Sequence, residues 1–335
     1  MSKTKTPQTV VITGASAGVG RAVVRRFGED GARIGLIARG IDGLEGAKRE
    51  VEEMGGRALV LPCDVSDYGA VQDAATKVEE AFGPIDVWVN AAFVGVLSRF
   101  IEMDMKDFEQ VTRVTYLGQV HGTRAALDRM LPRDRGAIVL VGSALAYRGI
   151  PLQSAYCGAK HAIQGFHDSI RSELIHARSR VHVGMVQLPG VNTPQFDWIR
   201  TNMPMKPKPA SPPYQPEIAA EAIHFIARTR RKSIKLGWPT WQAIWGDRFA
   251  SPLLDRYLAA TAFSGQQAAE PIEPGRRDNL YQPVPGDHGA HGRFDGTAKT
   301  RSTQLWVSKH RNSLLGAGLA LALGSFSAMA RAVRK

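Results

Sequence analysis

Tyr156 and Lys160 stand four positions apart in the stretch AYCGAK, residues 155–160. Residues four apart on a helix lie on one face, so these two side chains stack if the stretch is helical. A free phenol titrates near a pH of about 10, and a nearby ammonium stabilises the phenolate and lowers that pKa. The pair therefore predicts a general acid and base for alcohol and carbonyl chemistry. The alternative is a tyrosine that packs beside a lysine.

A glycine-rich loop lies near the start of the chain, in VVITGASAGVGRAVV, residues 10–24. Gly14, Gly18 and Gly20 stand between a predicted strand and a predicted helix. Glycines allow a tight turn and a close approach of the backbone to a pyrophosphate, and the helix N-terminus supplies free N–H groups. The loop therefore predicts a dinucleotide site, and the alternative is a purely structural turn.

The end of the second predicted strand indicates which dinucleotide binds. A site for NAD usually places an acidic residue about 20 positions after the glycines, on the ribose hydroxyls. This chain has Ala38 and Arg39 there instead. No carboxylate repels a 2′-phosphate, and a guanidinium can pair with one. The pattern favours NADP (NADPH) over NAD, and the alternative is a surface arginine beside a site that accepts both.

The rest of the chain up to about residue 260 alternates short apolar runs with longer amphipathic stretches. Apolar runs of this kind are typical of strands that are covered on both faces. The predicted strands are 9–13, 32–38, 58–62, 85–90, 137–143, 181–187 and 233–237. The predicted helices are 19–30, 41–55, 67–82, 104–131, 153–178 and 216–229. The alternation predicts an α/β fold with a doubly wound parallel sheet and helices on both faces.

Two segments interrupt this alternation. Residues 189–215 are rich in proline and too long for an ordinary connection, which favours a functional lid, with Phe196 and Trp198 placed to touch a substrate. Residues 263–304 are rich in glycine and proline and show no periodicity, so we predict a linker. The tryptophans that follow the last predicted strand, at positions 238, 241 and 245, have helical spacing and indicate core or a subunit interface.

The basic character of the chain is concentrated in its tail. The formal net charge is +12, and without the seven lysines and arginines from position 299 onward it falls to +5. Residues 314–330 carry no charge and are bracketed by basic residues, with a small residue every four positions from 316 to 328. A spanning helix needs about 20 apolar residues, so this stretch is marginal. It favours contact with an anionic membrane over nucleic acid, against a helix docked on protein or a solvated tail.

The composition of the chain argues against disulfide-rich, metal-binding and secreted classes of protein. The chain has 335 residues, of which 44% are hydrophobic, and its two cysteines, Cys63 and Cys157, form no spaced pattern. We therefore expect a reducing compartment, with no disulfide framework and no metal site. The first residues, MSKTKTPQ, are polar and do not resemble a secretory signal, which favours a cytoplasmic protein, membrane-associated if the tail binds lipid.

These motifs together resemble the short-chain dehydrogenase/reductase family over about residues 8–260. The resemblance rests on TGASAGVG (13–20), CDV (63–65), NAA (90–92), YCGAK (156–160), PGVNTP (189–194) and Ser143, thirteen residues before Tyr156. It implies a Rossmann-fold dehydrogenase domain, which we place over 1–262, and the composition adds the linker 263–304 and an apolar, basic-flanked helix over 305–335. It also implies a homodimer or homotetramer built on the long helices 104–131 and 153–178.

The resemblance implies a role for residues along the whole cofactor. Those that would hold its phosphates are Gly14, Ser16, Gly18, Val19 and Gly20. Those that would lie at its adenosine end are Arg39, Asp64 and Val65. Those that would lie toward the nicotinamide are Asn90, Tyr156, Lys160, Pro189, Val191 and Thr193. Ser143 would hydrogen-bond the substrate oxygen and polarise it.

One position departs from the family pattern. The family commonly has an Asn in the long helix, where it holds a water in the proton relay to the lysine, and this chain has Thr115 there. A threonine hydroxyl offers one donor and a shorter reach. We expect an NADP-dependent oxidoreductase that interconverts a carbonyl and its alcohol, on a hydrophobic substrate. The alternatives are a cofactor-binding scaffold with little turnover, and a different reaction on the same fold.

Overall fold

The computed structural model describes residues 7–209, 212–311 and 313–314 and is built around one seven-stranded sheet. The strand order is β10-β7-β6-β4-β1-β2-β3, and every neighbouring pair is parallel. The strands are β1 (Thr9–Thr13), β2 (Arg33–Ala38), β3 (Arg57–Pro62), β4 (Val87–Asn90), β6 (Ala137–Ser143), β7 (His182–Leu188) and β10 (Ser233–Lys235). The order reverses between β1 and β4, which opens a crevice at the carboxyl edge of the sheet.

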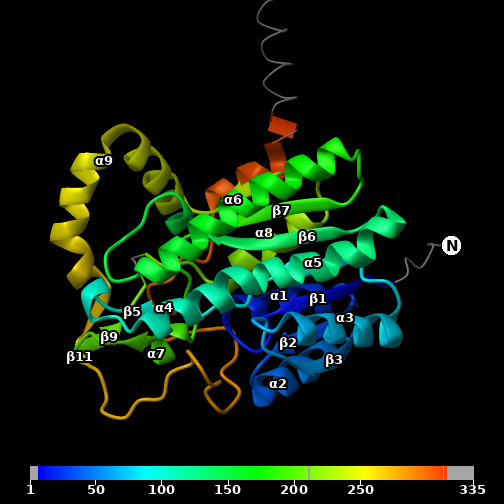
Figure 1. Ribbon diagram of the computed structural model, residues 1–335, viewed down its shortest axis with the longest axis horizontal. Helices are drawn as coiled ribbons and strands as arrows, with labels where there is room; N and C mark the ends of the chain where they lie inside the picture. The colour runs from blue at the N-terminus through cyan, green and yellow to red at the C-terminus, as the bar shows by residue number, and fades with distance from the viewer. Residues whose placement is uncertain (1–6, 210–211, 312, 315–335) are drawn as a thin grey trace, which may run out of the picture.

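Helices cover both faces of this sheet (Figure 1). One apolar layer packs β1 and β2 against α1 (Gly18–Gly28), α2 (Ile41–Glu53) and α8 (Pro216–Ala227). The other packs the opposite face against α3 (Tyr68–Phe82), α5 (Gly118–Met130) and α6 (Ser154–His176). The predicted doubly wound α/β fold is therefore confirmed, and the seven predicted strands match the observed ones to within two residues.

The long helix predicted over 104–131 is not continuous. It consists of α4 (Met105–Val111), a π-helical turn over Thr112–Leu117, and α5. A π turn closes its hydrogen bonds one residue later than an α turn, so it widens the helix locally. Inside it, the hydroxyl of Thr115 donates to the carbonyl of Val94 at 2.7 Å and accepts from its N–H at 3.0 Å. The wide turn thus ties the helix to the loop that follows β4.

The predicted lid, 189–215, is held to the body by short elements. Strand β8 (Arg200–Thr201) pairs with β5 (Val96–Leu97), and β9 (Met205–Pro207) pairs with β11 (Gln267–Pro271). Before them in the chain, α7 (Gln195–Trp198) lies beside the carboxyl edge of the sheet (Figure 1). These pairings anchor the middle of the segment.

Helix α9 (Trp238–Gly265) stands away from the sheet (Figure 1). It bends at Ala250, whose φ of −145° and ψ of 37° are not helical, two residues before Pro252. A proline inside a helix clashes with the carbonyl four residues earlier, which accounts for the bend. Thr240 is its one buried residue, while Trp238 is 58% and Trp245 49% exposed, so these two tryptophans are not in the core of this chain.

Residues 263–304 do not form the predicted linker. The first three of them end α9, and β11 follows. Beyond β11, Leu280 is fully buried and Ala290 is 2% exposed, each packed into one of the two apolar layers. Beyond β11 the segment is held by side-chain and backbone hydrogen bonds to the rest of the chain, and not by helices or strands. Its sequence therefore shows no periodicity. The predicted boundary at 262 falls inside α9.

The C-terminal region is described only in part. Residues 303–311 are helical, and Leu305 packs into the layer formed by α1 and α8. Most of the apolar stretch 314–330 lies outside the described residues. Among the helices that the structure does describe, none is long and apolar enough to cross a membrane.

Candidate active site

The glycine loop joins β1 to α1 at the point where the strand order reverses. Gly14 and Gly18 have φ of +72° and +57°, a region that side chains other than glycine rarely adopt. A Cβ on Gly14 would meet the backbone of Ala92 at 2.8 Å, and one on Gly20 would lie 2.0 Å from the carbonyl oxygen of Gly14. The helix cap Ala17 has no side-chain hydrogen bond to the first turn. Because no side chain caps the first turn of α1, this helix N-terminus suits an anion.

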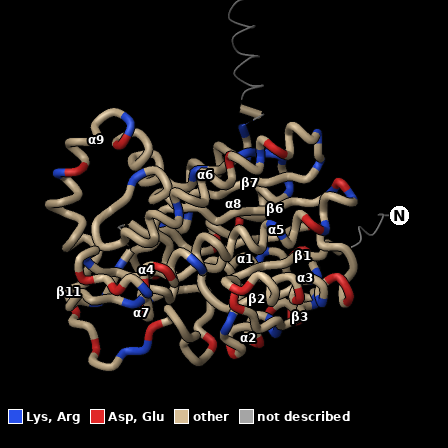
Figure 2. Tube along the Cα trace, viewed as in Figure 1, with Lys and Arg blue, Asp and Glu red and all other residues tan. Residues whose placement is uncertain are grey.

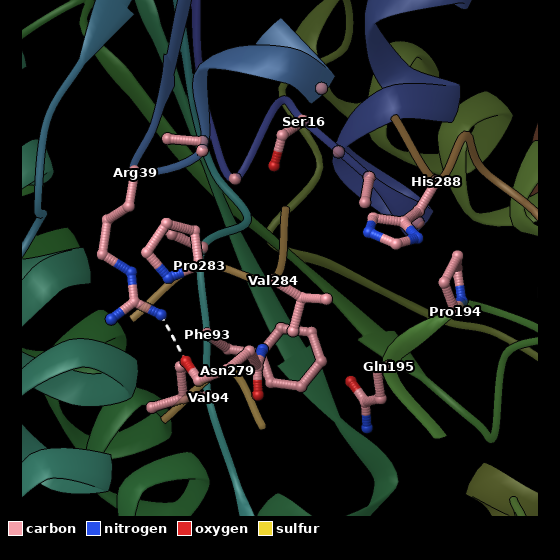
Figure 3. Close-up of a pocket in the computed structure, with 18 of the residues that line it drawn as sticks. Ser16, Arg39, Phe93, Val94, Pro194, Gln195, Asn279, Pro283, Val284 and His288 are labelled. Atoms are coloured by element: carbon pink, nitrogen blue, oxygen red, sulfur yellow. Dashed lines mark hydrogen bonds between the residues drawn. The ribbon is translucent and has the colours of Figure 1, made fainter. Parts of the chain in front are cut away.

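The cavity along this loop runs across the carboxyl edge of the sheet (Figure 3). It brings together most of the residues predicted for the phosphates and the adenosine. Its lining includes Gly14, Ser16, Gly18, Val19, Gly20, Arg39, Asp64, Val65 and Thr193. Burial lowers the pKa of the Arg39 guanidinium, and the carboxylate of Asp64 opposes this shift. Because a half-buried cation lies at the end of β2, the cavity suits a ligand with an extra phosphate.

Five predicted cofactor residues lie outside the lining of this cavity, namely Asn90, Pro189, Val191, Tyr156 and Lys160. Asn90, fully buried at the end of β4, accepts a hydrogen bond from Trp88 Nε1 at 3.0 Å and donates to Thr123 Oγ1 at 3.1 Å. Its side chain therefore points toward α5, and the residues that follow it, Ala91 and Ala92, line the cavity. Pro189 and Val191 are buried beyond the end of β7.

Ser143, Tyr156 and Lys160 meet at the carboxyl end of β6. Ser143 ends the strand, and α6 presents Tyr156 and Lys160 on one face, with the Lys160 ammonium 5.5 Å from the centre of the tyrosine ring. Burial raises the pKa of the Tyr156 phenol, and a hydrogen bond with Ser143 opposes this rise. Burial lowers the pKa of Lys160 to about 7. The group combines a protonated phenol, a hydroxyl and a titrating ammonium.

Lys160 is held by the backbone of the sheet. Its ammonium donates to the carbonyl of Val141 at 2.7 Å, and the side chain is 2% exposed. The ring of Phe93 covers it, with the ammonium 5.8 Å from the ring centre. This fixes the charge beneath the tyrosine, where it can act on the phenol.

A family model described as short chain dehydrogenase matches residues 8–203. The chain belongs to the short-chain dehydrogenase family.

Individual proteins also resemble the chain. The uncharacterized oxidoreductase YxnA of Bacillus subtilis (strain 168) is 29% identical over 97% of this chain and 91% of its own length. The 3-ketodihydrosphingosine reductase of Bos taurus is 32% identical, but the match covers 56% of this chain and 57% of that protein. A metagenomic short-chain oxidoreductase solved in complex with NADP is 27% identical with a TM-score of 0.58, over 68% of this chain and 95% of that chain.

Thr115, which we expected to stand where the family commonly has an asparagine, lies in the π-helical turn. Its single hydroxyl proton is already donated to the carbonyl of Val94, and the residue is fully buried. Val94 lines the cavity, so Thr115 orders one of its walls. The hydroxyl is therefore committed to the backbone and does not have its proton free for a water.

Gln119, one helical turn beyond Thr115, was not indicated by the sequence. Its Nε2 donates at 3.1 Å to the carbonyl of Val141, the same oxygen that accepts from Lys160. Its Oε1 is buried and has no hydrogen-bond partner among the described residues. A buried amide oxygen close to an ammonium is a place where a bridging water binds. The four-residue spacing from Thr115 is the one sequence signal that could have pointed to it.

The far wall of the cavity comes from the segment that was predicted as a linker. Asn279, Pro283, Val284 and His288 face the glycine loop and Arg39 across the cavity (Figure 3). Within the predicted lid, the Trp198 ring lines the cavity and packs edge-on against His288, with centres 4.6 Å apart. No pattern in the sequence of 279–288 indicates this role.

Proposed function

We propose that this short-chain dehydrogenase interconverts a ketone or aldehyde and its alcohol by hydride transfer with NADP. One observation carries the proposal. Ser143 and Lys160, both buried, and the partly buried Tyr156 cluster at the carboxyl edge of the sheet, to which the cavity lined by the glycine loop and Arg39 also belongs. The structural relative solved with NADP supports the choice of cofactor. When bound, the cofactor supplies or accepts the hydride.

The residues of the chain would handle the proton. In reduction the carbonyl carbon gains a hydride, and its oxygen becomes an alkoxide that takes the proton of the Tyr156 phenol. Because burial keeps the pKa of Tyr156 high, the phenol is protonated at neutral pH and ready to act as an acid. Ser143 would donate to the same substrate oxygen. Lys160, positive below a pH of about 7, would stabilise the phenolate that remains.

Apolar groups around Tyr156 support a hydrophobic substrate. The rings of Phe93 and Tyr156 pack edge-on with centres 5.9 Å apart. The Ile199 side chain, from the predicted lid, lies beside Gly95 and is 5% exposed. Apolar walls with few polar groups are typical of pockets for small apolar molecules. The relative named 3-ketodihydrosphingosine reductase supports a ketone among the substrates.

We also propose a membrane contact through 314–330, to which the neighbouring described surface adds support. A groove between α9 and the helix 303–311 is lined by Trp238, Trp241 and Trp245 together with Arg231, Lys235 and Arg311, and by no acidic residue. Charged residues are sparse along α9 (Figure 2). Exposed aromatic rings beside cations suit an anionic lipid surface. Binding to phosphatidylserine vesicles, weakened in Trp245→Ala and unchanged in Ile175→Ala, would support this.

Assembly into a homodimer or homotetramer through α4, α5 and α6 stays a proposal. The exposed apolar side chains Met105, Leu117 and Ile175, which are 54%, 37% and 64% exposed, lie on this part of the surface. Sedimentation velocity of the full chain, compared with Leu117→Lys, would measure it. A monomer at micromolar concentration would contradict this assembly.

The proposed activity is tested by titrating NADPH and NADH into the full chain and following the fluorescence of the cofactor. We expect NADPH to bind at least tenfold more tightly, a difference of about 1.4 kcal/mol. A panel of hydrophobic ketones and aldehydes would then be screened with NADPH. Equal binding, or tighter binding of NADH, would contradict the NADP assignment. Binding without turnover of any carbonyl, or turnover without net consumption of cofactor, would favour the alternatives of a scaffold or of another reaction.

A further inference from the structure

Residues 279–289, which we call the strap, cross the cavity on the side opposite to the sheet. The strap comes from the C-terminal part of the chain, yet it contacts both groups on which a dinucleotide's phosphates depend. One is the guanidinium of Arg39 and the other is the N–H of Gly18, in the glycine loop.

At Arg39 the contacts are all to backbone carbonyls. One terminal nitrogen donates to the carbonyls of Leu280 at 3.1 Å and Tyr281 at 3.0 Å, and the other donates to the carbonyl of Asn279. These bonds use three of the five N–H donors of the guanidinium. The strap thus holds the cation through neutral acceptors.

At the glycine loop the contact is to a single amide. The N–H of Gly18, the first residue of α1, donates to the carbonyl of Gly289 at 3.0 Å. An amide N–H has one proton, so this group cannot serve a phosphate while the strap carbonyl accepts from it. Gly289 has a φ of +62°, a conformation that glycine adopts without strain.

Ion pairs and a buried side chain fasten the strap in this position. Asp287 accepts two hydrogen bonds from the guanidinium of Arg21, at 2.9 and 3.3 Å. The Arg21 side chain is only 2% exposed. The hydroxyl of Tyr281 donates to Asp107 at 2.8 Å. The fully buried Leu280, next to Tyr281 in the chain, anchors the segment in the core.

We propose that the strap and the phosphates of NADP bind the same two groups in alternation, so that the cofactor enters only when the strap carbonyls release Arg39 and Gly18. The proposal rests on the proposed function, because it takes NADP as the ligand of this cavity. The exchange favours the cofactor at Arg39, since a hydrogen bond from a guanidinium to a phosphate is roughly twice as strong as one between neutral groups.

A reversible lock on the strap tests this directly. A Cβ built on Gly40 lies 3.2 Å from the Cβ of Pro283, and Gly40 has a φ of −84° that any residue adopts. The double variant Gly40→Cys/Pro283→Cys therefore places two thiols within reach of a disulfide, whose Cβ atoms lie about 3.5–4.5 Å apart. Cys63 also lines the cavity, so the background carries Cys63→Ser. Mass spectrometry would verify the bond.

The oxidised and reduced forms of this one protein are matched controls. We expect the oxidised form to bind NADPH at least tenfold more weakly by cofactor fluorescence, and reduction with dithiothreitol to restore the affinity. Equal affinity in both forms would overturn alternation, as would equal affinity with slower association and dissociation, which describes a cover over a bound cofactor. Failure of the wild type to bind NADPH would overturn the proposed function and, with it, this inference.

A second variant changes binding in the opposite direction. Asp287→Asn removes the charge that fastens the strap to Arg21, so NADPH should associate several-fold faster in stopped-flow measurements. Glu270→Gln is the matched control, because Glu270 pairs with Lys206 at 3.2 Å in an exposed position and does not line the cavity. An unchanged or slower association in Asp287→Asn, with native stability retained, would contradict the alternation.

Discussion

Gln119 and Lys160 donate hydrogen bonds to one oxygen, the carbonyl of Val141, at 3.1 and 2.7 Å. Side chains from α5 and α6 therefore meet at a single acceptor oxygen near Tyr156. The amide lies next to the ammonium, so the charge on Lys160 should respond to the chemistry of residue 119.

Substitution of Gln119 tests this coupling. Gln119→Glu places a carboxylate beside the ammonium, which should raise the pKa of Lys160 by about 1 unit and shift the basic limb of the pH profile of kcat/KM upward. Gln119→Leu should lower kcat with little change in KM and without an upward shift. A residue that only fills space would give two variants with the same pH profile, and that result would exclude a positioning role.

The lowered pKa of Lys160 predicts how stability depends on pH. Below a pH of about 7 both the folded and the unfolded chain hold the proton, and burial of the ammonium costs stability in full. Between that pH and the ordinary lysine pKa of 10.5 the folded chain releases the proton while the unfolded chain keeps it, so stability rises with pH. Lys160→Met should therefore stabilise the chain most below pH 7 and progressively less toward pH 10.

Urea unfolding of the wild type and of Lys160→Met at the two ends of this range measures the effect. The difference between the two proteins cancels the titration of groups that they share. A gain in stability that stays constant across the range would show that Lys160 remains charged in the folded chain, and would contradict the lowered pKa.

The charge at Arg39 should discriminate between the two nicotinamide cofactors. Arg39→Ala removes the guanidinium that we propose for the 2′-phosphate, and hydrogen bonds to charged groups contribute about 1.5–3 kcal/mol. The dissociation constant of NADPH should rise at least tenfold, while that of NADH should rise much less. Arg99→Ala, on an exposed arginine paired with Glu102, is the control. Equal losses for both cofactors would remove Arg39 from the phosphate site.

Two glycines should respond to alanine in opposite directions. Gly20→Ala forces a Cβ to within 2.0 Å of the carbonyl of Gly14, so it should destabilise the chain and abolish binding of cofactor. Gly165 lies inside α6, is exposed, and has nothing within 4 Å of an added Cβ. Gly165→Ala should therefore stabilise the chain by about 0.5–1 kcal/mol. Thermal unfolding of both variants provides the measurement.

The sequence was sufficient for those parts of the fold in which local pattern and tertiary structure agree. Strand β6 coincides with the apolar run 137–143, and Tyr156 and Lys160 share a face of α6 as their spacing predicts. The sequence could not place Asn90, because its side chain is oriented by Trp88 and Thr123, of which only Trp88 lies nearby in the chain. The apolar pattern of a sequence identifies a helix or strand, whereas the orientation of a side chain depends on partners that are distant in the chain.

The strap could not be predicted, because its contacts do not depend on periodicity. Arg39 and Gly18 donate hydrogen bonds to backbone carbonyls of the strap. Every residue type has a backbone carbonyl, so the residue types at 279–289 carry little information about the contact. The π turn at Thr112–Leu117 was missed for a similar reason, since the apolar spacing of 104–131 is compatible with one continuous helix. In both cases hydrogen bonds to distant parts of the chain accompany the local structure.

The central claim is that Tyr156 donates the proton in a reduction that uses NADPH. The measurement is single-turnover oxidation of NADPH with a ketone identified in the screen, compared between the wild type and Tyr156→Phe, with NADPH affinity measured alongside. We predict that the hydride-transfer rate falls about 10²–10⁴-fold in Tyr156→Phe while the affinity for NADPH is unchanged. A variant that transfers hydride at the rate of the wild type would contradict the account.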